Sequence, residues 1–116
     1  MTDVKITVGG GFKEEASHRF VDAWHRAERG EHFHERRLSF ENWDALSRVL
    51  TGKRMELLHY VRRHQVASIR ALAKALERDY SNVHADVQAL VATGLLDVSG
   101  RGLRADYDTI ETTIAI

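Results

Sequence analysis

The sequence predicts an α+β fold, and three observations support it. Two helix-like apolar stripes lie within residues 68–96, separated by a break of only three or four residues. Glycines then lie between two short strand-like segments at residues 95–98 and 103–105, as expected of a β-hairpin. Apolar and polar residues also alternate near both ends of the chain, which is typical of half-buried strands.

Length and composition indicate one compact domain with an appendage. The chain has 116 residues, of which 43% are hydrophobic, so it can bury one modest core but not two large ones. No apolar run approaches the roughly 18 residues that span a bilayer, and residues 1–3 do not resemble a signal peptide. We therefore expect a soluble protein of the cytoplasm. The absence of cysteine excludes disulfides, thiolate zinc sites and cysteine nucleophiles.

Charge is distributed unevenly along the chain, although the formal net charge is zero. Residues 51–105 carry nine Lys or Arg against five Asp or Glu, a net charge of +4. Residues 1–50 and 106–116 carry net charges of −1 and −3. Contacts with phosphates supply most of the sequence-independent affinity for DNA, so only the central segment favours a polyanionic partner.

The first fifty residues predict a strand-helix-strand extension followed by a short helix. A strand is expected at residues 3–8, with three apolar side chains on its buried face: Val4, Ile6 and Val8. A helix is expected at 13–29, and residues 32–40 are expected to be extended. A further helix at 41–50 would have Ser39 as its N-cap and four apolar side chains turned inward: Trp43, Leu46, Val49 and Leu50.

Three helices are predicted between residues 51 and 94, each with an N-cap residue before an apolar stripe. The caps are Thr51, Ser68 and Asp79. The stripes are Leu57, Leu58 and Val61, then Ile69, Leu72, Ala73 and Leu76, then Val83, Val87, Leu90 and Val91. The first helix should end near His64, the second before a break at 77–79, and the third at Gly94. Four basic residues of the first helix are expected to face solvent: Lys53, Arg54, Arg62 and Arg63.

Three helices followed by a hairpin form the order of a winged helix-turn-helix. A turn of three or four residues makes the second and third helices cross steeply, so one face of the third helix projects and can enter a DNA major groove.

A last strand is expected within residues 106–116, because alternate residues there are apolar or β-branched. These are Ile110, Thr112, Ile114 and Ile116.

The face of the third helix opposite its apolar stripe is the candidate DNA-reading surface. Its serine, asparagine and glutamine side chains can hydrogen-bond to base edges, and its alanine allows close approach or contact with a thymine methyl. Arg78 precedes this helix and is placed to bind a phosphate. An ordinary solvent-exposed face would have a similar composition. The predicted DNA-binding residues are Ser68, Arg70, Arg78, Tyr80, Ser81, Asn82, His84, Ala85, Gln88, Arg101 and Arg104.

Residues 38–112 resemble a known family. The similarity lies in RVLTGKRMELLHYV, in SIRALAKALERDYSNVHADVQALVATGLL and in YDTIE after the hairpin. These stretches are similar to small prokaryotic winged-helix proteins, distantly MarR-like, that act as DNA-binding antitoxins and are often encoded beside a toxin of the TumE type. The most specific element is RDY at 78–80 with NVH at 82–84 and DV at 86–87, whereas basic residues are usual in the family at Ala85 and Gln88. The resemblance implies a repressor that also neutralises a toxin.

Catalysis and cofactor binding have little support in the sequence. No Ser-His-Asp trio or carboxylate pair stands out, and the glycines at 9–11 lack the pattern of a phosphate-binding loop. His32 and His34, flanked by glutamates, provide two imidazoles and a carboxylate but no clear fourth ligand for a closed zinc site. We therefore expect no enzyme activity, no metal and no cofactor.

The expected function is a sequence-specific DNA-binding repressor, and the resemblance adds the role of an antitoxin. The protein is expected to bind a palindromic operator in double-stranded DNA as a homodimer, through a winged helix at residues 51–105. Residues 1–50 and 106–116 would serve dimerisation or binding of a cognate toxin, because strand edges can pair with another chain. Two alternatives are an adaptor or inhibitor that uses the winged helix without DNA, and a ligand-responsive MarR-like regulator.

Overall fold

The computed structural model describes residues 2–9 and 34–116, and this part of the chain has an α+β fold. Its elements are β1 (Thr2–Val8), β2 (His34–Phe40), α2 (Trp43–Val49), α3 (Gly52–Arg63), α4 (Ile69–Leu76), α5 (Tyr80–Thr93), β3 (Asp97–Ser99), β4 (Gly102–Arg104) and β5 (Thr109–Ile114). The predicted fold class is confirmed at this level. The helix predicted at 13–29 and His32, one of the two histidines considered as zinc ligands, lie outside the described residues.

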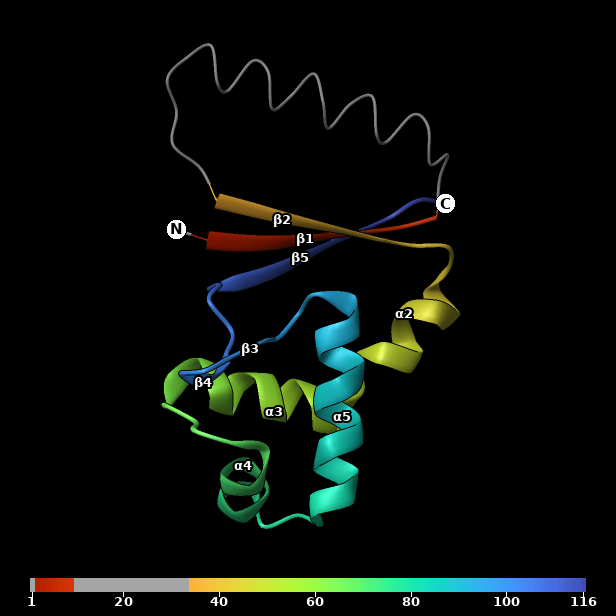
Figure 1. Cartoon of the computed structure of the whole chain (residues 1–116). Coiled ribbons are helices and arrows are strands. Elements are labelled where there is room, and N and C mark those ends of the chain that lie inside the picture. The colour runs from red at the N-terminus through yellow and green to blue at the C-terminus, as the bar shows by residue number, and fades with distance from the viewer. Residues whose placement is uncertain (1, 10–33) are drawn as a thin grey trace.

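The described residues form a sheet and a compact group of helices, connected by α2 (Figure 1). The sheet contains β1, β2 and β5. The other elements, α3, α4, α5, β3 and β4, are here called the helix–hairpin unit. Buried residues of both parts belong to one apolar cluster, so the sheet and the helix–hairpin unit share a core.

The sheet has the strand order β2-β1-β5, and both pairs are parallel. The predicted first strand is confirmed, and its three apolar residues, Val4, Ile6 and Val8, are buried. The segment predicted to be extended, residues 32–40, corresponds to β2, and the last strand predicted within residues 106–116 corresponds to β5. A parallel pair needs a long crossover connection. The helix–hairpin unit lies in the connection from β2 to β5, so residues from both ends of the chain form one sheet.

The short helix α2 differs from its prediction in two respects. Asn42 is its N-cap, since its side chain accepts a hydrogen bond from Ala45 N at 2.9 Å, and the predicted cap Ser39 was wrong because it lies within β2. Trp43 was predicted to turn inward but is 57% exposed. Side chains lean toward the N-terminus of their helix, so a residue of the first turn can project beyond the core. Leu46 is buried, as predicted.

The three predicted N-caps of the helix–hairpin unit are confirmed. Thr51 Oγ1, Ser68 Oγ and Asp79 Oδ2 accept hydrogen bonds from Arg54 N, Ala71 N and Asn82 N at 3.3, 3.1 and 3.3 Å. The predicted stripes are buried or pack against the buried residues. The break at 77–79 is also confirmed, and Glu77 adopts the left-handed conformation with φ of 55°. Gly94 ends α5 in the same conformation.

The hairpin of β3 and β4 makes a contact that the sequence analysis did not anticipate. Leu103 N donates to Val66 O at 2.9 Å, which adds a single antiparallel bridge from the α3–α4 loop. Gly102 makes this approach possible. It has a φ of 108°, and a Cβ atom at this position would lie 2.1 Å from Val66 O. No other residue type fits there without a backbone shift.

Tyr107 ties the end of α5 to the segment that leads into β5. Its hydroxyl donates to Leu95 O at 2.8 Å, and burial raises the pKa of Tyr107 to about 12.

Of the helices described, the longest is α5 with 14 residues, and none has the length and apolar character of a membrane span.

Candidate nucleic-acid interface

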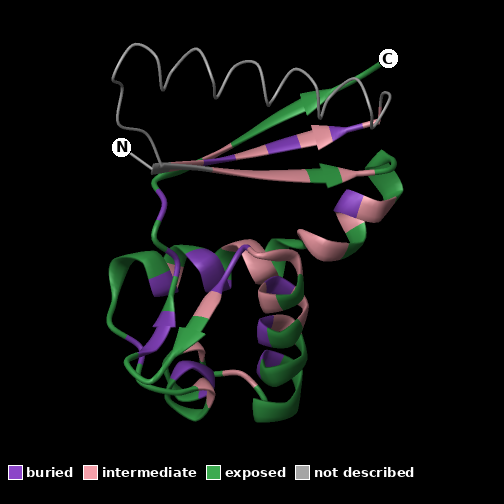
Figure 2. Cartoon of the chain, turned by 45° about the horizontal axis from the view of Figure 1, so that its top comes forward, coloured by how far each residue is buried: buried purple, intermediate pink, exposed green. Residues whose placement is uncertain are grey.

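One side of α5 is buried and the opposite side is exposed (Figure 2). The buried side carries Val83, Val87 and Leu90, which are inaccessible to solvent. The exposed side carries six residues, from the first turn to the last: Ser81, Asn82, His84, Ala85, Gln88 and Ala92. Five of these six were predicted to contact DNA, and the structure places all five on the same side of α5.

The exposed side of α5 is polar but carries no Asp, Glu, Lys or Arg side chain. Asp86 is the one Asp, Glu, Lys or Arg residue of α5, and it lies at the margin, with only 14% of its side chain exposed. A neutral polar surface can approach a DNA groove without repulsion from phosphates, and it leaves hydrogen-bonding groups for base edges.

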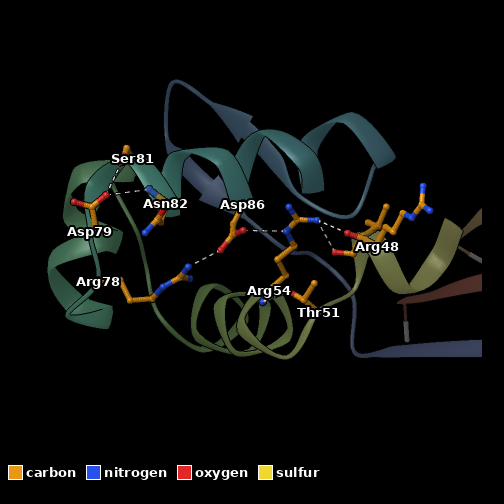
Figure 3. Close-up of polar contacts among 9 residues, drawn as sticks. Arg48, Thr51, Arg54, Arg78, Asp79, Ser81, Asn82 and Asp86 are labelled. Carbon is orange, nitrogen blue, oxygen red and sulfur yellow. Dashed lines mark hydrogen bonds and ion pairs between the residues drawn. The ribbon is translucent and has the colours of Figure 1, made fainter. Parts of the chain in front are cut away.

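Two arginines hold Asp86 from opposite sides (Figure 3). Arg54 Nε of α3 lies 3.0 Å from Asp86 Oδ1, and Arg78 Nη2 of the α4–α5 turn lies 2.7 Å from Asp86 Oδ2. Burial disfavours the charged carboxylate, but the hydrogen bonds from Arg78 and Arg54 outweigh this effect, so the pKa of Asp86 is lowered. Asp86 therefore remains an anion at neutral pH and connects α5 to two other segments.

Arg54 extends this network to α2. Its Nη1 donates to the carbonyl oxygens of Arg48 and Val49 at 2.9 and 3.0 Å, and these carbonyls belong to the last turn of α2. Arg54 was predicted on the solvent side of its helix, which is wrong, because only 18% of its side chain is exposed. The helical pattern placed it on the polar face, but the contact with Asp86 depends on how α3 and α5 pack together.

Arg78 points to Asp86 and is only 16% exposed, in contrast to the other predicted DNA-binding residues, which are exposed. Its Nη1 is buried and has no hydrogen-bond partner among the described residues. The predicted contact between Arg78 and a phosphate stays a prediction. The observed contact gives this residue a different role, since it fixes the α4–α5 turn to the middle of α5.

Residues of α4 and the start of α5 gather beside the exposed side of α5. The guanidinium of Arg70 lies 5.2 Å from the centre of the Tyr80 ring, and the Tyr80 and His84 rings are 5.8 Å apart. Ser81 Oγ donates to Asp79 Oδ2 at 2.5 Å. This hydrogen bond and that from Asn82 N lower the pKa of Asp79. Ser81 therefore directs its hydroxyl hydrogen to the cap and retains acceptor capacity for an external donor.

Basic residues also surround a groove beside the hairpin. The groove has a volume of about 600 Å³ and is lined in part by Arg62, Arg63, Arg101 and Arg104. Arg104 pairs with Asp106 at 3.2 Å, and Arg62 pairs with Asp108, which raises the pKa of Arg62. Arg63 and Arg101 form no ion pair with another described residue, so their guanidinium groups are available to an external anion. Charge counting along the sequence did not single out Arg62 and Arg63 as part of this groove.

A smaller cavity lies between α3 and the start of β5. Its volume is about 190 Å³, and apolar residues such as Met55, Leu58 and Ile110 line much of it. Pockets for small molecules usually have volumes of about 300 Å³ or more. The described residues contain no cluster of three or more His, Asp or Glu side chains able to hold a metal ion.

Comparison with known proteins gives a family match over the helix–hairpin unit. No curated protein and no solved structure matches the chain. The model of the HVO_A0114 family matches residues 49–112, from the end of α2 into β5. This match includes every predicted DNA-binding residue and covers more than half of the chain. The protein therefore belongs to the HVO_A0114 family.

Proposed function

We propose that this protein is a non-enzymatic, sequence-specific DNA-binding repressor of the cytoplasm, and that α5 is its recognition helix. The observation that carries the proposal is the exposed, uncharged polar side of α5, held in place by the Arg54–Asp86–Arg78 network and flanked by exposed arginines. Side chains that read bases must be positioned firmly, and flanking cations supply affinity for phosphates.

The finer fold assignment, a winged helix-turn-helix, is part of this proposal. Three features support it: the three-residue turn between α4 and α5, the hairpin after α5, and the bridge between Val66 and Leu103 that adds a third extended segment to the hairpin. In such an arrangement the first turns of α5 enter the major groove, and the hairpin lies against the backbone nearby.

In the major groove of the DNA, Asn82 and Gln88 act as hydrogen-bonding residues, because amide side chains can pair with the N6 and N7 positions of adenine. Ala85 lies between them on the exposed side and allows the helix backbone to approach the bases. Arg70 in α4 and Arg101 between β3 and β4 serve as phosphate contacts, since both are exposed. Arg54 and Arg78 act as positioning residues through Asp86.

The biological role within this proposal is that of an antitoxin, which represses its own operon as a homodimer and neutralises a cognate toxin. Its support is the resemblance of residues 38–112 to winged-helix antitoxins, together with the exposed sheet edge described below. A small toxin-like reading frame beside the gene is the expected observation. The absence of such a reading frame would favour a free-standing repressor over an antitoxin.

A mobility-shift assay with the DNA upstream of its own gene tests the proposed recognition helix. Ala85→Glu places a carboxylate in the middle of the exposed side of α5 and should reduce affinity at least 100-fold. Asn82→Ala removes one base contact and should reduce affinity about 5- to 150-fold, which corresponds to about 1–3 kcal/mol. Ala92→Glu is the matched control. It lies on the same side of α5, about 10 Å farther along, and should have a much smaller effect.

Salt dependence distinguishes DNA binding from the adaptor alternative. Binding that displaces counterions weakens steeply as salt is added, and the slope reflects the number of phosphate contacts. Arg101→Ala should therefore weaken binding to all sequences and make the slope shallower. Two outcomes would rule out the recognition helix and favour an adaptor that binds only proteins. One is that the natural chain binds no DNA duplex at low salt, and the other is that Ala85→Glu binds the duplex with unchanged affinity.

A further inference from the structure

The strand β5 leaves a row of backbone groups unpaired within the described part of the chain. It pairs there only with β1. Ala115 N donates to Val8 O at 2.9 Å, so the backbone groups of odd-numbered residues point toward β1. In a parallel pair these directions alternate along the strand. The N–H and C=O groups of Ile110, Thr112 and Ile114 therefore point away from the sheet.

The same residues carry apolar and β-branched side chains on the face that bears Val4, Ile6 and Val8. Ile114 is 47% exposed, and Ile116 beyond the strand is fully exposed. The single charged residue of β5, Glu111, lies on the other face and pairs with Lys5 at 3.5 Å. An exposed edge of this kind invites pairing with another strand. The opposite edge strand, β2, has three consecutive charged residues at 35–37, which discourage such pairing.

We propose that β5 pairs in antiparallel fashion with β5 of a second copy of this chain, about a two-fold axis through Thr112. The two three-stranded sheets would then join into a continuous sheet of six strands. An isologous contact of this kind uses the same surface on both copies and closes as a dimer.

The pattern of β5 specifies the register. Centred on Thr112, the outward backbone groups of the two strands face each other, and Ile110 lies opposite Ile114 of the second copy at both ends. Glu111 then lies opposite Thr113 of the second copy. A register centred on Glu111 would place two carboxylates opposite each other, which is destabilising. A register centred on Thr113 would require residues beyond the end of β5.

A dimer through β5 would present two copies of α5 to the two halves of a palindrome. This link to an operator rests on the proposed function, but the pairing itself does not involve α5 or DNA. The experiment is therefore performed on the full chain in the absence of DNA, so its failure and the failure of DNA binding can be distinguished.

Single cysteines test the register, because the natural chain contains none. Opposed residues in a hydrogen-bonded antiparallel pair have Cα atoms about 5.5 Å apart, which is within disulfide range. Thr112→Cys should form a covalent dimer under mild oxidation, seen on a non-reducing gel. Glu111→Cys and Thr113→Cys should not, because each lies opposite a different residue of the second copy. A covalent dimer at 111 or 113 but not at 112 would overturn the proposed register.

Light scattering after size exclusion tests the dimer itself. The natural chain should have twice the mass of the monomer. Thr112→Lys places two ammonium groups opposite each other and should give a monomer. Thr113→Lys is the matched control, since the new lysine lies opposite Glu111 of the second copy and should leave the dimer intact. A monomeric natural chain, or a dimeric Thr112→Lys variant, would overturn the proposal.

Discussion

The helix–hairpin unit and the three-stranded sheet differ in how far apart in the chain their interacting residues lie. Each N-cap of the helix–hairpin unit bonds to a residue three positions later. In the sheet, Thr109 Oγ1 donates to Asp3 Oδ1 at 2.6 Å across nearly the whole chain. Local contacts form at a low entropic cost, whereas parallel strands pair only after a long loop has closed. Local signals therefore predict the unit in detail but not the partners of the strands.

The two regions also differ in what their surfaces leave available. The helix–hairpin unit ties its segments together through caps, a hairpin and the Val66 bridge, and it exposes side chains on α5. The sheet exposes backbone along β5. This difference underlies the two proposals made above, which are recognition of DNA by side chains of the unit and pairing of the sheet with a second copy of the chain. The following substitutions test how far each region depends on its particular contacts.

Gly102→Ala should have the largest effect on stability. The new Cβ atom would meet Val66 O at 2.1 Å, and the φ of 108° is unfavourable for alanine. We expect a loss of about 3 kcal/mol in the free energy of unfolding, measured in urea. Gly100→Ala is the control, because nothing lies within 4 Å of its Cβ position, and it should change stability by less than about 0.5 kcal/mol. Equal effects of the two substitutions would contradict a specific role for the Val66 contact.

Asp86→Ala should have the next largest effect, a loss of about 2–3 kcal/mol, because two mostly buried guanidinium groups lose their partner. Asp44→Ala is the matched control. It breaks the exposed pair with Arg48, which is worth less than about 0.5 kcal/mol. Asp86→Ala should also weaken DNA binding, since α5 loses its ties to α3 and the turn. Natural affinity in a variant that remains folded would show that the network does not position α5.

The same carboxylate makes stability depend on pH at the acid end. The pKa of Asp86 is lowered in the folded state from its ordinary value of 3.8. Its contribution is therefore fully present above that value and is lost as the pH falls through the lowered pKa. The stability difference between the natural chain and Asp86→Ala, measured by urea unfolding, should be constant from pH 5 to 7 and shrink below about pH 4. A difference that does not shrink at all as the pH falls below 4 would exclude the ion pairs as its source.

Glu77→Gly should have the smallest effect, and it should be stabilising. Glu77 ends α4 in the left-handed conformation, which glycine adopts without steric penalty. We expect a gain of about 0.5–1 kcal/mol in the free energy of unfolding. Glu77→Ala keeps the unfavourable conformation and should give no gain. If thermal unfolding shows the same change for both variants, the backbone conformation at position 77 is not the cause.

The sequence alone determined α3, α4 and α5, their caps and their apolar stripes, because these depend on residues at most four positions apart. It also determined which side of α5 is exposed, since Val83, Val87 and Leu90 mark the opposite side. Even here it had limits. The start of α2 was misplaced because Ser39 and Asn42 are equally good caps in isolation, and only the pairing of β2 with β1 separates them.

Only the tertiary structure decided which distant residues meet. Arg54 and Asp86 are 32 positions apart, and no periodicity in either helix specifies that they form an ion pair. The same holds for the bridge between Val66 and Leu103 and for the strand order β2-β1-β5. Alternation shows which face of a strand is buried, but it contains no information about the neighbouring strand, because any apolar face can pack against any other.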